Sequence, residues 1–267
     1  MSILSQEFYI NNSIVHALSS GGDQKKMVVL LHGFPFNANM WLPQLERPAY
    51  GWQYLAIDFP GYGLSDAPAQ IDILSYANMV GQLLQNFKDK KVVVAGLSMG
   101  GYVALALYSL GYVSLNGLVL CHTQATADND QVKAHRLLTG RSIRMYGMEQ
   151  YAVDSLKKLF GASAQSQRPE LLDYFAIMMA KAKVPVVLST LEALASRSDY
   201  TQVLQQITIP TLIIAGSEDK IISKEKIAQL QTIKGSSVFW IQQAGHLSNW
   251  EQSHEFNEVL NNFLKTI

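Results

Sequence analysis

The sequence predicts an α/β fold: a mostly parallel, doubly wound sheet of eight strands with a helical cap inserted after the sixth strand. Two observations carry this prediction. Short, uniformly apolar runs end at turns and alternate with segments whose apolar residues recur every three or four positions. Runs that are apolar throughout are typical of strands covered on both faces. Between about residues 122 and 200 the alternation stops, and only helical patterns remain.

Apolar and β-branched runs predict the individual strands. The first two strands lie within residues 3–20 and flank the turn signal Asn11-Asn12. The other runs follow, in chain order, at 26–31, 54–57, 91–95, 115–121, 209–215 and 238–241. Because helical segments separate most of them, we expect parallel strands joined by right-handed crossovers.

Helical periodicity fills the gaps between these strands. Ser75 is the expected N-cap of the first long helix, and a second helix is expected to stop near Gly111. Four helical stretches lie between the sixth and seventh strands, around 130–146, 148–160, 169–181 and 184–196. A crossover usually needs a single helix, so we interpret residues 122–200 as a cap and residues 1–121 and 201–267 as the core.

The composition excludes several classes of partner. The chain has 267 residues, 48% of them hydrophobic, and its formal net charge is zero. Without a run of Lys or Arg, binding to nucleic acid or to an anionic membrane is not expected. No apolar run approaches the roughly 20 residues that span a bilayer, and the first residues lack the pattern of a signal peptide. We therefore expect a cytoplasmic protein, of an oligomeric state that the sequence leaves open.

The candidate nucleophile is Ser98, in the stretch Gly96-Leu97-Ser98-Met99-Gly100. The apolar run before it predicts a strand, and the segment after it predicts a helix. The two glycines leave room where strand and helix approach closely, so the serine can adopt a strained conformation with its hydroxyl above the sheet.

A serine hydroxyl needs a base and a group that orients the base. Of the six histidines, His246 is the best candidate, because it follows the last predicted strand at the sheet edge that also carries Ser98. The orienting carboxylate should also follow a strand. Asp219 does so and fits the chain order serine, acid, histidine, although its neighbour Glu218 remains an alternative from sequence alone.

The oxyanion of an acyl-transfer reaction needs two backbone donors. Met99 directly follows Ser98 and begins the predicted helix, so its N–H is one candidate. The other is the N–H of Phe34, in the turn His32-Gly33-Phe34 that ends the third strand. His32 is then expected to brace that turn.

Five stretches together resemble the α/β-hydrolase fold superfamily: His32-Gly33-Phe34-Pro35, residues 58–66, residues 96–101, residues 216–219 and residues 245–251. The resemblance implies a triad of Ser98, Asp219 and His246, with Phe34 and Met99 as oxyanion donors. Serine at the nucleophile position argues against haloalkane dehalogenases and epoxide hydrolases, which carry aspartate there. Within the superfamily the chain is similar to small carboxylesterases, including the 3-oxoadipate enol-lactonase branch.

We therefore expect a serine hydrolase that acts on a small carboxylic ester or lactone without a cofactor or metal ion. The candidate substrate-binding residues are His122, Trp41, Arg136 and Met178. Arg136 is included because an enol-lactone carries a carboxylate. Two alternatives stay open: related triad chemistry, such as carbon–carbon bond hydrolysis, thioester hydrolysis or perhydrolysis, and a ligand receptor on a hydrolase scaffold.

Overall fold

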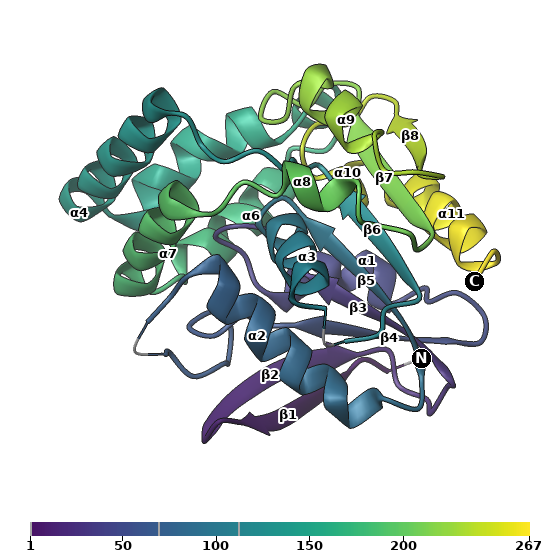
Figure 1. The fold of residues 1–267 in the computed structure, drawn as a ribbon. Helices are drawn as coiled ribbons and strands as arrows, with labels where there is room; N and C mark the ends of the chain where they lie inside the picture. The colour runs from purple at the N-terminus through teal and green to yellow at the C-terminus, as the bar shows by residue number, and fades with distance from the viewer. Residues whose placement is uncertain (1, 69, 112) are drawn as a thin grey trace.

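A computed structural model describes residues 2–68, 70–111 and 113–267. The strands are β1 (Leu4–Ile10), β2 (Ser13–Ser19), β3 (Lys26–Leu31), β4 (Trp52–Ile57), β5 (Lys91–Leu97), β6 (Gly117–Cys121), β7 (Thr211–Gly216) and β8 (Ser237–Ile241). They form one eight-stranded sheet in the order β1-β2-β4-β3-β5-β6-β7-β8. β2 runs antiparallel to both β1 and β4, and every other neighbouring pair is parallel. The predicted mostly parallel sheet is confirmed (Figure 1).

Helices lie between most of the strands. Before β6 they are η1 (Ala38–Trp41), α1 (Leu42–Leu45), α2 (Ile73–Leu84), η2 (Gln85–Phe87) and α3 (Met99–Leu110). Between β6 and β7 they are α4 (Asp130–Leu159), α5 (Ala162–Gln167), α6 (Glu170–Ala180), α7 (Val184–Ser196) and α8 (Thr201–Leu204). The last are α9 (Lys224–Leu230), α10 (Ser248–Glu251) and α11 (Ser253–Leu264). Gly147, with φ 84° and ψ 176°, divides α4 into two helices, at the break between the predicted stretches 130–146 and 148–160.

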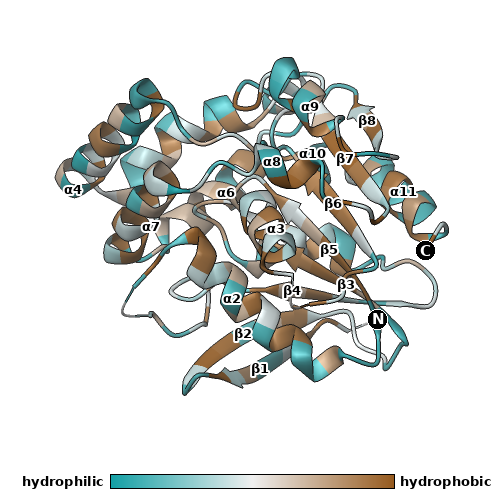
Figure 2. Ribbon diagram, viewed as in Figure 1, coloured by the Kyte–Doolittle hydropathy of each residue, from teal (hydrophilic) through white to brown (hydrophobic). Residues whose placement is uncertain are grey.

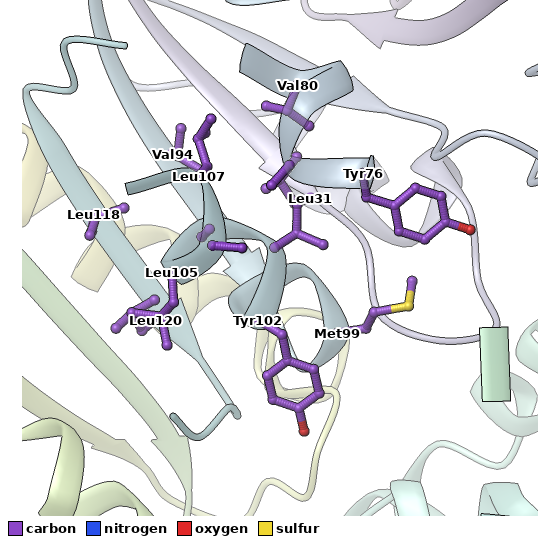
Figure 3. Close-up of a cluster of buried hydrophobic side chains, with 14 of the residues drawn as sticks. Leu31, Tyr76, Val80, Val94, Met99, Tyr102, Leu105, Leu107, Leu118 and Leu120 are labelled. Atoms are coloured by element: carbon purple, nitrogen blue, oxygen red, sulfur yellow. The ribbon is translucent and has the colours of Figure 1, made fainter. Parts of the chain in front are cut away.

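Both faces of the sheet are covered, as uniformly apolar strands require. In β3, Val29 and Leu31 face the cluster that contains α2 and α3, whereas Val28 and Leu30 face the cluster that contains α11. Figure 3 shows the first cluster, in which side chains from β3, β5 and β6 meet those of α2 and α3. Hydrophobic residues accordingly dominate the central strands, whereas α2 and α11 alternate between apolar and polar residues (Figure 2).

The start of α2 differs from the prediction. Asp72 is its N-cap and accepts a hydrogen bond from the backbone N–H of Ser75, while Ser75 stands at the third helical position and its hydroxyl interacts with the backbone of Asp72. Both residue types are common N-caps, and this reciprocal capping box places them three residues apart. The sequence prediction therefore chose the second of two capping residues.

Of the helices between β6 and β7, α4, α6 and α7 lie together on one side of the molecule (Figure 1). α4 and α7 share a small apolar cluster formed by Ile143, Met148, Val187 and Leu191. The division into a cap at 122–200 and a core at 1–121 and 201–267 stays a prediction. Within the described ranges, no helix combines the length and the hydropathy that crossing a membrane demands.

Candidate active site

Ser98 occupies a sharp turn between β5 and α3. Its φ of 54° and ψ of −112° are unusual for a residue with a side chain. A Cβ atom on Gly96 would overlap the backbone of Gly100, and a Cβ atom on Gly100 would overlap the carbonyl group of Leu31. The two glycines therefore allow strand, turn and helix to pack at the distance that this turn requires.

The end of β6 and the loop that follows it hold the Ser98 backbone. The Ser98 N–H donates to the carbonyl oxygen of Cys121 at 2.9 Å, and the Thr123 hydroxyl donates to the Ser98 carbonyl oxygen at 2.9 Å. Ser98 is thus hydrogen-bonded to both chain neighbours of His122.

The candidate oxyanion donors flank this turn. Met99 is buried at the first position of α3. Phe34 follows Gly33, and a Cβ atom on Gly33 would lie 3.6 Å from the Cβ atom of Ser98, so the end of β3 lies against the serine. The role of both N–H groups as oxyanion donors stays a prediction.

His32 braces the loop that carries Phe34. Its Nε2 accepts a hydrogen bond of 3.1 Å from the backbone N–H of Phe59, so Nδ1 carries the proton and donates to the Gly33 carbonyl oxygen at 2.9 Å. Complete burial lowers the pKa of His32 to about 4. This histidine is therefore a neutral structural residue at pH 7.

Asp219 and His246 form a buried pair. His246 Nδ1 lies 2.9 Å from Asp219 Oδ2, and both side chains are 3% exposed. The other oxygen, Oδ1, accepts the backbone N–H groups of Ile221 at 2.7 Å and Ile222 at 3.1 Å. Burial alone would raise the pKa of Asp219, but the charge of the two neighbouring histidine rings and their hydrogen bonds to the carboxylate hold it well below its usual range. An ionised Asp219 accepts the Nδ1–H of His246 and leaves Nε2 free to accept a proton.

The other carboxylates that follow strands are used elsewhere. Glu218, the alternative acid, accepts hydrogen bonds from the backbone N–H and the hydroxyl of Ser163, in α5. Asp58 contacts His16, with His16 Nδ1 2.7 Å from its Oδ2, and also accepts the backbone N–H groups of Ala38 and Leu64. Of these carboxylates, Asp219 is the one that contacts His246.

His122 is a second histidine beside the same carboxylate. It follows β6 with a φ of 47°, is fully buried, and places Nδ1 2.9 Å from Asp219 Oδ2. Its Nε2 lies 2.6 Å from the hydroxyl of Ser248. His122, Asp219 and His246 are spaced to hold a metal ion, with their ligand atoms within 4.8 Å of one another. Two N–H···O hydrogen bonds to one ionised oxygen account for the same spacing.

The loop that carries His246 is held by Glu251, a residue to which the sequence analysis gave no role. The buried carboxylate accepts the backbone N–H groups of Gly161 at 2.8 Å, Gly245 at 2.9 Å and Leu247 at 3.0 Å. The His246 N–H itself donates to the carbonyl oxygen of Leu159, the last residue of α4, at 2.7 Å. The loop that carries His246 is thus tied directly to the end of α4.

The four candidate substrate-binding residues lie in different surroundings. His122 joins the Asp219 cluster. Trp41 is fully buried in the apolar core, with its ring 6.1 Å from that of Phe256, and the structure does not bring it to the cluster. Arg136 is paired with Asp128. Met178, on α6, lines a cavity at the boundary between α6 and the loops that follow β3 and β4.

The chain is similar to known proteins over most of its length. Residues 26–253 match the family model described as alpha/beta hydrolase fold. The 3-oxoadipate enol-lactonase 1 of Acinetobacter baylyi is 24% identical over 251 residues, which cover 93% of this chain and 92% of that protein.

Two solved structures share the whole architecture. A thermophilic esterase from Thermogutta terrifontis has a TM-score of 0.89 at 27% identity and covers 100% of this chain and 99% of its own. An enol-lactonase from Burkholderia xenovorans has a TM-score of 0.88 at 25% identity, covering 97% of this chain and 100% of its own.

Proposed function

The chain belongs to the α/β-hydrolase fold family, and from this premise we propose that it is a serine hydrolase that cleaves a small carboxylic ester or lactone through an acyl-enzyme on Ser98. The observation that carries the proposal is the strained Ser98 turn at the sheet edge that also holds the buried Asp219–His246 pair. Esterases and enol-lactonases among the relatives support the choice of substrate class.

The first half of the reaction forms the acyl-enzyme. His246 Nε2 removes the proton from the Ser98 hydroxyl as Oγ attacks the carbonyl carbon of the substrate. Asp219 stabilises the imidazolium that results, and the N–H groups of Phe34 and Met99 stabilise the oxyanion. Collapse of the tetrahedral intermediate expels the alkoxide, which takes the proton from His246. With a lactone, the alcohol stays attached to the acyl group.

The second half releases the acid. His246 removes a proton from a water molecule, which attacks the acyl carbon, and Ser98 leaves with the proton returned by the same ring. Every proton and electron pair in both halves is supplied by side chains, backbone or water, so the proposal includes no cofactor. The formal net charge of zero also fits a small-molecule substrate better than a polyanion.

Turnover of a substrate panel tests the proposal. Short esters, lactones, thioesters and diketones are offered to the wild type and to Ser98→Ala, with Ser109→Ala as a matched control because Ser109 is exposed on α3, the helix that follows Ser98. We expect ester or lactone turnover that falls by about 1,000-fold or more in Ser98→Ala and stays at the wild-type level in Ser109→Ala. Near-wild-type turnover by Ser98→Ala, or turnover of diketones alone, contradicts the proposal.

A further inference from the structure

We propose that His122 is a positioning residue that shares the charge of Asp219 with His246 and so makes His246 a weaker base than it would be in a simple pair. The inference rests on the proposed function, because it assigns His246 the role of base. It concerns a histidine that the reaction steps above do not use. Asp219 Oδ2 has two imidazole partners, His246 Nδ1 and His122 Nδ1, each at 2.9 Å.

The geometry leaves little freedom around the carboxylate. The His122 and His246 rings meet edge to face, with centroids 5.4 Å apart and an interplanar angle of 66°. Asp219 Oδ1 is occupied by two backbone N–H groups of the loop that follows. The carboxylate is therefore held at both oxygens, and removing His122 would leave His246 as the one ring that binds Oδ2 in this cluster.

The hydrogen bonds determine the tautomer of His122. An ionised Asp219 can only accept, so His122 Nδ1 must carry a proton. Burial lowers the pKa of His122, and this effect exceeds the opposing effect of Asp219, so the ring is neutral at pH 7 and Nε2 has a lone pair that can accept a hydrogen bond. The Ser248 hydroxyl then donates to Nε2 across 2.6 Å. Ser248 lies two residues after His246, so the loop of the base also fixes the tautomer of its neighbour.

The hydrogen bond from His122 to Asp219 changes the strength of His246 as a base. Each N–H donor stabilises the negative charge of Asp219, and the stabilised charge attracts a proton on His246 less strongly. Without His122, Asp219 would hold a proton on His246 more strongly, and His246 would be less able to accept the Ser98 proton. Other charged groups border the cluster: Glu251 on α10, and Glu218 and Lys220 beside Asp219. They are unchanged in the variants below, so their contribution cancels.

Two substitutions of similar shape distinguish a His122 that acts through its hydrogen bond to Asp219 from a His122 that only fills space. Asn places an N–H donor near the position of His122 Nδ1 and tolerates the φ of 47°. Leu has similar branching but no donor. We expect the acid limb of kcat/KM for His122→Leu to move to higher pH by about 0.5–1 unit. The acid limb for His122→Asn should stay within about 0.2 unit of wild type. A purely structural His122 predicts lower turnover at every pH with no movement of the limb.

Nitrogen-15 NMR of the histidine rings in the wild type supplies a measurement independent of turnover and of the folding of any variant. We expect His122 at pH 7 to carry its proton on Nδ1, with Nε2 unprotonated. A proton on Nε2 at pH 7, or an unmoved acid limb in His122→Leu, overturns the inference. Absence of ester and lactone turnover in the wild type contradicts the proposed function instead and leaves the NMR result valid.

Discussion

Replacing Glu251 by glutamine should loosen the loop that carries His246. Glu251 is 3% exposed, and its carboxylate accepts the backbone N–H groups of Gly161, Gly245 and Leu247. Two of these share Oε2 and one uses Oε1. A glutamine side chain has one acceptor oxygen, so its NH2 group must face at least one N–H group that needs an acceptor.

The cost follows from those three hydrogen bonds. One bond to a charged group contributes about 1.5–3 kcal/mol, and a buried donor left without an acceptor costs about 1–3 kcal/mol. Burial raises the pKa of Glu251, because a charged carboxylate is destabilised inside the protein. A neutral glutamine does not carry this destabilisation, so part of the loss is offset. We expect Glu251→Gln to lower the free energy of unfolding by about 2 kcal/mol.

Glu218→Gln is the matched control, since Glu218 also binds the segment after α4. Its carboxylate accepts hydrogen bonds from the backbone N–H and the hydroxyl of Ser163. A glutamine there keeps both bonds, because its oxygen accepts the N–H while its NH2 group donates to the hydroxyl. The same change of charge and shape should therefore cost less than about 1 kcal/mol.

Urea denaturation followed by circular dichroism measures both variants against the wild type. Ester turnover at a fixed pH then reports whether the loop still places His246, and we expect a loss in Glu251→Gln that exceeds any loss in Glu218→Gln. Equal unfolding midpoints for Glu251→Gln and the wild type, or equal shifts in the two variants, would refute the idea that the three N–H groups depend on the carboxylate.

Three further outcomes are expected. Gly100→Ala places a Cβ atom against the backbone at the end of β3. Urea denaturation should show that it lowers the free energy of unfolding by about 3 kcal/mol, and most of the turnover should be lost. The control is Gly111→Ala, in open space at the end of the same helix with a φ of 70°, which should lower the free energy of unfolding by about 1 kcal/mol. Because the pKa of Asp219 is lowered only in the folded state, wild-type stability should fall as pH drops below about 4, and the fall should be shallower in Asp219→Asn. Arg197→Met removes a buried partner of Asp128, and thermal unfolding should report a loss of about 3 kcal/mol; an unchanged midpoint would contradict the assigned pairing.

The sequence predicts the order of strands along the chain and the turn at Ser98 because both depend on local patterns. Uniformly apolar runs mark strands covered on both faces, and Gly96 and Gly100 mark the close approach of β5 and α3. Parallel strands bring their carboxyl ends to one edge, so residues after β7 and β8 were expected to meet. Asp219 and His246 do so.

Contacts between distant loops could not be predicted in the same way. The pairing of His122 with Asp219 depends on the register of β6 against β7 and on the left-handed backbone of His122, and the two residues lie 97 positions apart in the chain. Glu251 receives its partners from loops 90 and 6 residues away. Many sequences carry a histidine at the end of a strand or a glutamate after a loop. Neither pattern indicates which groups will contact that side chain in the folded protein.

Mass spectrometry of the protein after reaction with a phosphonate ester tests the central claim most directly, because such a reagent bonds covalently to an activated serine oxygen. We predict one adduct per chain, on the peptide that contains Ser98, with no adduct in Ser98→Ala and slower labelling when His246 is replaced by alanine. An adduct on another serine, or unreduced labelling of Ser98→Ala, would contradict the assignment of Ser98 as the nucleophile.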